Sequence, residues 1–264
     1  MPYFTTSDGC KLHYEQTGSG KPLFMIHGWS QSAALFKKNI PELSKHYQVT
    51  AVDVRGHGES DKPAHGYRVS RFATDMHELI CHLGLKEVNI LGWSMGCSVI
   101  WSYWELFGAD RLSKMILVDE PGWLMKTQDN PYGMLTYDEL VTMCKNILKD
   151  YPKAASDLIR GLVTTDLPEE EIQFMIDENM KIPKEYSARL AYIHWLTDWR
   201  DIIPTITLPT LIISGKKSFV NWKSQAWNNE HIPGSKIVFF EGRGHIMFFE
   251  EPEKFNRAVE DFIG

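Results

Sequence analysis

Closely spaced cysteines are absent from this sequence. Its four cysteines lie far apart along 264 residues, at Cys10, Cys81, Cys97 and Cys144. Disulfide frameworks of small secreted domains and thiol-based metal sites both use cysteines at short spacings such as C-x-x-C. The spacing therefore argues against both and predicts reduced, mostly buried thiols.

The sequence also lacks a long uninterrupted apolar segment. No run reaches the roughly 20 residues that a membrane-spanning helix needs. The first eight residues, MPYFTTSD, contain no basic region followed by an apolar region, which is the pattern of a secretory signal. We therefore expect a cytoplasmic protein without a membrane span.

Positive charge is not concentrated in any part of the chain. The formal net charge is −6 and there is no basic stripe, which argues against a nucleic-acid partner. The ten histidines are dispersed and form neither an H-x-x-x-H nor an H-E-x-x-H pattern. We expect no metal, no organic cofactor and a small molecule as the partner, while a monomer and a homodimer remain equally compatible with the sequence.

One pattern of glycine and serine is informative, namely Gly92-Trp93-Ser94-Met95-Gly96. An apolar run over residues 88–91 precedes it, and a helix-like run over residues 97–101 follows it. A serine between two glycines at a strand-to-helix junction is the G-x-S-x-G nucleophile elbow. The turn is so tight that the serine takes a strained backbone conformation and only residues without a Cβ fit two positions away. We therefore predict that the Ser94 hydroxyl is exposed at the C-terminal edge of a sheet.

A second motif follows an apolar, strand-like run that ends in His27-Gly28-Trp29. Acyl-transfer enzymes with a nucleophile elbow place a loop here that carries one N–H group of the oxyanion hole. The second donor is the N–H of the residue after the nucleophile. The expected donors are therefore the backbone N–H groups of Trp29 and Met95.

A third motif lies near the C-terminus. A strand-like run over residues 236–240 is followed by a glycine-flanked loop that contains His245, and a helix is expected over residues 252–263. The serine precedes the histidine in the chain. This is the order in hydrolases with a nucleophile elbow and not that of chymotrypsin or subtilisin. His245 is the expected general base.

Together these motifs resemble the α/β-hydrolase superfamily over nearly the whole chain. The segment Asp53-Val54-Arg55-Gly56-His57-Gly58-Glu59-Ser60 is similar to the D-x-R-G-x-G-x-S loop after the fourth strand of that superfamily. Within it, the sequence is most similar to the esterase, lactonase and non-haem chloroperoxidase-like group, whose substrates are diverse. The resemblance implies an α/β fold, a mostly parallel sheet flanked by helices with an inserted all-helical cap.

The acid of the expected triad departs from the family pattern. Its usual place follows the strand before the histidine strand, and Ser218 occupies that place here. A serine cannot stabilise an imidazolium by charge. Some α/β-hydrolases carry the acid instead at the end of the strand that corresponds to residues 115–118. We therefore predict Asp119 as the acid, with Glu120 as the second choice.

The hydrophobic periodicity changes after Asp119. Strand-like and helix-like runs alternate before it, whereas apolar residues three or four positions apart predict only helices from there to about residue 204. We expect a core formed by residues 1–120 and 205–264, and a helical cap of residues 121–204 over Ser94. The expected cap helices are residues 137–148, 154–162, 168–180 and 186–196.

The cap region is rich in aromatic and thioether side chains, which favour an apolar, adaptable pocket. Trp29, Trp123 and Trp195 are the predicted pocket residues. No motif places a lysine or arginine to hold a carboxylate or phosphate. We therefore expect a small to medium, neutral and hydrophobic ester or lactone as the substrate.

The predicted function is serine hydrolysis through an acyl-enzyme, with Ser94 as nucleophile, His245 as base and Asp119 as acid. Two alternatives stay open. Cofactor-free dioxygenases of similar fold use the histidine and a strand-end acid to deprotonate their substrate. A ligand-binding receptor with residual hydrolase activity would keep a slow triad. Perhydrolase activity would use the same acyl-enzyme with peroxide in place of water.

Overall fold

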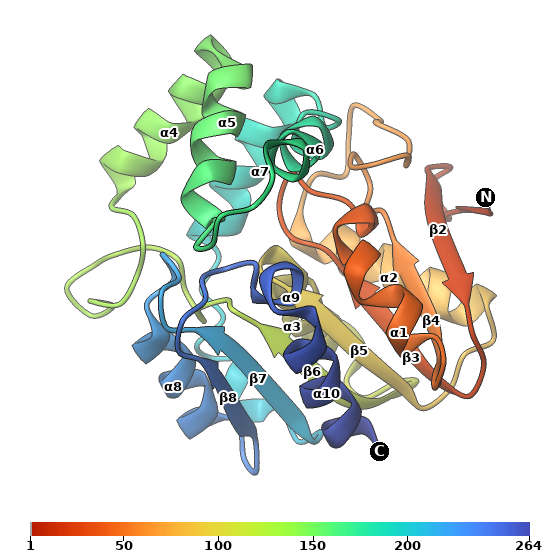
Figure 1. Cartoon of the computed structure of the whole chain (residues 1–264). Coiled ribbons are helices and arrows are strands. Elements are labelled where there is room, and N and C mark those ends of the chain that lie inside the picture. Colours follow the sequence, from red (N-terminus) through yellow and green to blue (C-terminus); the bar gives the residue numbers. More distant parts are fainter. Residues whose placement is uncertain (1) are drawn as a thin grey trace.

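A sheet of eight strands runs through the part of the chain that the computed structural model describes, residues 2–264 (Figure 1). The strand order is β1-β2-β4-β3-β5-β6-β7-β8. β2 is antiparallel to both of its neighbours, and all other neighbouring strands are parallel. The strands are β1 (Tyr3–Thr5), β2 (Lys11–Thr17), β3 (Lys21–Ile26), β4 (Tyr47–Val52), β5 (Val88–Trp93), β6 (Leu112–Val118), β7 (Thr210–Gly215) and β8 (Lys236–Phe240). This mostly parallel sheet confirms the predicted fold class.

Helices cover both faces of the sheet, because successive side chains of a strand point to opposite faces. In β3, Phe24 and Ile26 pack on one face, whereas Leu23 and Met25 pack on the other, and all four are fully buried. The helices on the first face are α2 (Val69–His82), α3 (Met95–Phe107) and α8 (Trp222–His231). Those on the second face are η1 (Ala33–Lys38), α1 (Ile40–Leu43), α9 (Met247–Glu250) and α10 (Pro252–Ile263).

An insert of four helices lies between β6 and β7, at one end of the sheet (Figure 1). Its helices are α4 (Tyr137–Lys149), α5 (Tyr151–Leu162), α6 (Glu169–Asn179) and α7 (Lys184–Leu196), and the short η2 (Ile203–Thr205) follows them. A capping box starts α4, in which Thr136 and Glu139 each accept a hydrogen bond from the other's backbone N–H. The insert agrees with the expected helical cap, whereas the boundaries 1–120, 121–204 and 205–264 stay a prediction.

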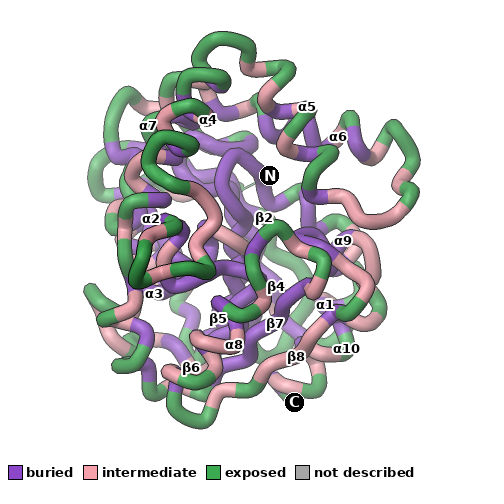
Figure 2. The backbone as a smooth tube through the Cα atoms, turned by 90° about the vertical axis from the view of Figure 1, so that its left-hand side faces the viewer, coloured by how far each residue is buried: buried purple, intermediate pink, exposed green. Residues whose placement is uncertain are grey.

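Burial follows this layered arrangement. In Figure 2 the buried backbone runs through the strands, and the outer turns of the α4–α7 insert are exposed. Cys10, Cys97 and Cys144 are buried, Cys81 is half-buried, and all four thiols are free. None of the helices within residues 2–264 has both the length and the apolar character that crossing a membrane requires.

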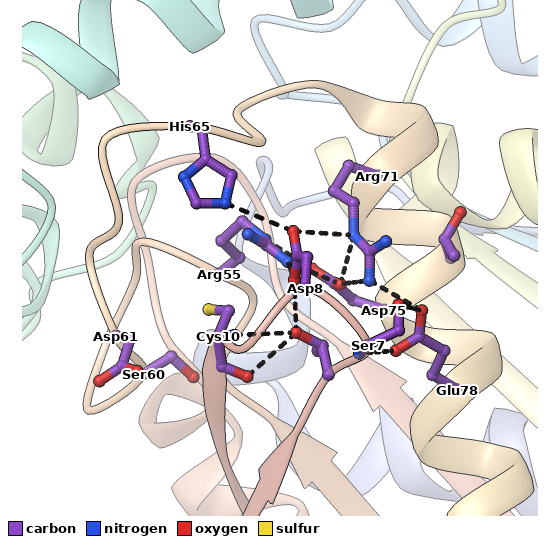
Figure 3. Close-up of polar contacts among 12 residues, drawn as sticks. Ser7, Asp8, Cys10, Arg55, Ser60, Asp61, His65, Arg71, Asp75 and Glu78 are labelled. Atoms are coloured by element: carbon purple, nitrogen blue, oxygen red, sulfur yellow. Dashed lines mark hydrogen bonds and ion pairs between the residues drawn. The ribbon is translucent and has the colours of Figure 1, made fainter.

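The loop after β4 is held by a network of charged side chains (Figure 3). The fully buried Arg55 donates hydrogen bonds of 2.9 and 3.0 Å to the carboxylate of Asp75 on α2. It also donates a 2.6 Å bond to Asp8, which lies in the β1–β2 turn, and Arg71 donates to Asp75 at 2.8 Å. The network therefore joins the first hairpin, the loop after β4 and α2.

The charge of this network depends on pH through Asp8. The hydrogen bond from Arg55 holds the pKa of Asp8 well below its usual range. A carboxyl group whose pKa is lowered by folding stabilises the folded state above its unfolded pKa, and that contribution is lost as the pH falls. The contact between Asp8 and Arg55 therefore stabilises the protein at neutral pH and weakens in acid.

We predict that Asp75→Asn lowers the free energy of unfolding by about 3 kcal/mol, because it leaves the buried Arg55 charge without its main partner. The measurement is urea unfolding at pH 7. Asp110→Asn is the matched control, since Asp110 is 55% exposed and pairs with His77 at the surface, and it should cost less than about 0.5 kcal/mol. Equal losses in the two variants would contradict a structural role for the buried pair.

Candidate active site

Ser94 lies in the tight turn between β5 and α3. Its φ of 54° is in the left-handed region, where a side chain is strained. The flanking glycines leave no room for a Cβ: one on Gly96 would lie 2.5 Å from the Ile26 carbonyl oxygen, and one on Gly92 would collide with the Gly96 carbonyl. The local conformation is therefore the elbow that the G-x-S-x-G spacing predicts.

Asp119 and His245 are hydrogen-bonded to each other. Oδ2 of Asp119 lies 2.8 Å from Nδ1 of His245, and the two side chains are 0% and 4% exposed. The other carboxylate oxygen, Oδ1, accepts bonds from the Ser214 hydroxyl at 2.9 Å and from the Gly215 N–H at 3.3 Å. Asp119 is thus positioned from β7, the strand that neighbours its own, and has a φ of 55°.

The ring of His245 has two aromatic neighbours. The Phe219 ring is 4.6 Å from it and the Trp93 ring 5.3 Å, measured between ring centres. The indole N–H of Trp93 also donates a 2.9 Å hydrogen bond to the His245 carbonyl oxygen. Because Trp93 directly precedes Ser94, this bond couples the position of the histidine loop to that of the elbow.

The two other residues considered for the acid have different partners. The Ser218 hydroxyl accepts a hydrogen bond from the Val220 N–H at 3.1 Å. Glu120 contacts His194 on α7, with 3.1 Å between Oε1 and Nε2. Of the three candidates, the structure brings only Asp119 to the ring of His245.

The loop after β3 is shaped by His27. Nε2 of this fully buried side chain accepts a hydrogen bond from the Val54 N–H at 3.0 Å, so Nδ1 carries the proton and donates to the Gly28 carbonyl at 2.7 Å. Burial lowers the pKa of His27, which favours this neutral ring. The neighbouring His57, 5.1 Å away between ring centres, also has its pKa lowered, to about 3, mainly by burial. His57 lies in the loop after β4, where its Nδ1 is 3.0 Å from the Arg55 carbonyl oxygen.

The two expected oxyanion donors lie in this region. Met95 is the first residue of α3, and the first N–H groups of a helix have no partner within it. Trp29 follows His27 and Gly28 in the loop after β3. Its indole lines the same cavity as Ser94 and His245. Whether the Trp29 and Met95 N–H groups act as oxyanion donors stays a prediction.

The insert is attached to the loop after β3 by hydrogen bonds. The Trp29 indole N–H donates to the Ser187 carbonyl on α7 at 3.1 Å, and the hydroxyls of Ser30 and Ser187 are 2.8 Å apart. The Ser32 hydroxyl donates to Glu178 on α6 at 2.6 Å. These contacts place the insert directly over the elbow.

A cavity of about 280 Å³ lies beneath the insert and is lined by Ser94, His245, Trp29 and Trp195. The two tryptophan rings pack edge to face, 5.2 Å apart. Much of the remaining surface is aliphatic or thioether, from Leu124, Met134, Leu135, Met143, Leu158 and Leu162. The cavity is therefore mainly apolar and contains the candidate nucleophile and base.

The structure does not bring Trp123 to this cavity. Trp123 lines a separate depression instead, with the Arg200 guanidinium 4.7 Å from its ring centre. The prediction for Trp123 is therefore wrong, because its position just after the strand end did not reveal how the following loop turns. Sequence reasoning also missed His194 and Phe219, since their contacts arise from packing between distant segments.

Within residues 2–264, one group of possible metal ligands occurs where α2 packs against the end of α3. His77, Cys81 and Asp110 have ligand atoms within 4.8 Å of one another. However, the Cys81 sulfur is 3.9 and 3.7 Å from the two ring nitrogens of His77. These nearly equal distances place it beside the ring and not along the lone pair of either nitrogen. Nε2 of His77 lies 2.9 Å from Oδ2 of Asp110, which is a direct hydrogen-bond distance.

Comparisons with known proteins agree with the fold. A family model described as the alpha/beta hydrolase fold matches residues 21–142. The non-heme chloroperoxidase CPO-A1 of Kitasatospora aureofaciens is 27% identical, over 100% of this chain and 99% of its own.

Two solved structures superpose closely on the chain. An esterase from Exiguobacterium antarcticum has a TM-score of 0.95 at 31% identity, over 99% of this chain and 98% of the esterase. A bromoperoxidase from Bacillus anthracis has a TM-score of 0.93 at 28% identity, over 97% and 96% of the two chains. This chain therefore belongs to the α/β-hydrolase fold family, with non-haem haloperoxidases and esterases among its relatives.

Proposed function

We propose that this protein hydrolyses a neutral, hydrophobic carboxylic ester or lactone through a serine acyl-enzyme. The observation that carries the proposal is the buried 2.8 Å hydrogen bond between Asp119 and His245, because His245 lines the same cavity as Ser94. A nucleophile, a base and a carboxylate that orients the base are the parts that this reaction needs. The esterase from Exiguobacterium antarcticum, at 31% identity, supports the same reaction class.

Each residue has a distinct role in the proposed reaction. His245 takes the proton of the Ser94 hydroxyl through Nε2, because its Nδ1 is bound to Asp119. The serine oxygen attacks the substrate carbonyl, and the N–H groups of Trp29 and Met95 stabilise the oxyanion. His245 then returns the proton to the leaving alcohol. Water repeats the two steps on the acyl-enzyme and releases the acid.

The composition of the cavity supports a neutral substrate. None of its lining residues is lysine or arginine, so the described part of the site offers no fixed cation to a carboxylate or phosphate. Apolar pockets of this kind bind ligands mainly through burial of hydrocarbon surface. The volume of about 280 Å³ suits a small to medium acyl or alcohol group.

We predict that Ser94→Ala and His245→Ala each lower kcat/KM for p-nitrophenyl esters by at least about 10³-fold. The measurement is hydrolysis of a series from acetate to decanoate. Ser70→Ala, which removes an exposed hydroxyl on α2, is the control and should leave the rates unchanged. Turnover that persists in Ser94→Ala, or oxygen uptake with an aromatic hydroxy-ketone, would favour the dioxygenase alternative. Tight ligand retention without turnover would favour a receptor.

A second prediction concerns the acid. Asp119→Asn should lower kcat by about 10⁴-fold, because an amide neither holds the required tautomer of His245 nor stabilises its charged form. Ser218→Ala should change kcat little, since its hydroxyl bonds only the nearby Val220 N–H. Near-normal turnover in Asp119→Asn would contradict the assignment of the acid.

A further inference from the structure

One buried polar contact in the cavity is not used by the proposed reaction. Glu120 follows Asp119 at the end of β6, and His194 lies on α7 of the insert. Their side chains are each 1% exposed, with 3.1 Å between Oε1 of Glu120 and Nε2 of His194. Both residues line the cavity together with Ser94 and His245. The pair thus connects the core with the insert in the wall of the candidate substrate site.

The pair has hydrogen-bonding capacity that the protein does not fill. Nδ1 of His194 is buried and has no partner within residues 2–264. The contacts of the Glu120 carboxylate, with His194 and with the Ser98 hydroxyl at 3.5 Å, both involve Oε1 and leave Oε2 free to accept. Buried polar groups are nearly always hydrogen-bonded, so an unfilled pair in a cavity wall points to a ligand group.

Two other residues of the lining also have an unpartnered polar atom, but neither belongs to a pair of ionisable side chains. The Gln31 amide N–H donates to the Met175 carbonyl at 3.3 Å, whereas its Oε1 and the Trp195 indole N–H are buried and have no partner within residues 2–264. Asp157 is 64% exposed and forms a 2.8 Å ion pair with Lys153, so it belongs to the solvent side of the cavity. Glu120 and His194 therefore form a buried polar pair in a cavity lining that is otherwise mainly apolar.

We propose that Glu120 and His194 form a subsite that binds a hydroxyl group of the substrate. A hydroxyl both donates and accepts. It can donate to Oε2 of Glu120, or it can bond Nδ1 of His194 as donor or acceptor according to the protonation state of the imidazole. A second carboxylate would be repelled by Glu120, and an alkyl group would leave both side chains unpaired. The inference rests on the proposed function for treating this cavity as the substrate site, and it narrows the substrate to a hydroxylated ester or lactone.

Binding to the Ser94→Ala protein tests the subsite without turnover. The probes are methyl hexanoate, methyl 3-hydroxyhexanoate and methyl 6-hydroxyhexanoate, and the measurement is isothermal titration calorimetry. At least one hydroxylated ester should bind about tenfold more tightly than methyl hexanoate, because its hydroxyl forms a hydrogen bond with a buried charged side chain. Equal affinities for the three esters would overturn the proposal.

Substitutions at the pair show whether it is responsible. Added to Ser94→Ala, either Glu120→Gln or His194→Gln should remove most of the preference for the hydroxylated ester. The matched control is His46→Gln, because His46 is exposed and directly precedes β4 at the opposite edge of the sheet. It should keep the full preference. A preference that survives both substitutions at the pair would contradict the subsite.

The wild-type protein separates this inference from the proposed function. Ser94-dependent hydrolysis of all three esters without a hydroxyl preference would support the esterase and overturn the subsite. Hydroxyl-dependent binding that requires Glu120 and His194, in a protein that hydrolyses no ester, would support the subsite and overturn the esterase. In an active enzyme, His194→Gln should lower the ratio of kcat/KM for the hydroxylated ester to kcat/KM for the plain ester by about tenfold. A tenfold change corresponds to about 1.4 kcal/mol of binding free energy.

Discussion

The parallel arrangement of β3, β5, β6, β7 and β8 is the constraint on which the site depends. Parallel strands all end at the same edge of a sheet, so residues that follow each strand end become neighbours irrespective of their distance in the sequence. Ser94 follows β5, Asp119 follows β6, and His245 lies in the loop after β8. The hydrogen bond between Asp119 and His245 spans 126 positions of the chain and exists because β7 aligns the two loops.

This constraint also explains which parts were predictable from the sequence. The elbow, the alternation of strands and helices, and the helical insert follow from local spacing and periodicity. Asp119 could be predicted because a residue that directly follows a strand of a parallel sheet lies at the same edge as the residues that follow the other strands. Trp123 was placed wrongly, and His194 was missed, because the path of an irregular loop and the packing of a cap helix depend on contacts that no local pattern encodes.

The insert completes the site, because residues of the core alone do not enclose the cavity. The bonds from the loop after β3 to α6 and α7 hold the insert against the same loop that contains Trp29. Trp195 and His194 on α7 then form part of the cavity wall. The core therefore supplies the groups proposed for catalysis, and the insert supplies much of the surface that a substrate would contact.

Asp119 and Glu120 are consecutive residues whose carboxylates contact different histidines. Asp119 contacts His245 in the core, and Glu120 contacts His194 in the insert. Both residues lie beyond β6, and Asp119 has a φ of 55°, so the turn at Asp119 directs the two carboxylates to different neighbours. An insertion or deletion within β6 would therefore disturb both contacts at once.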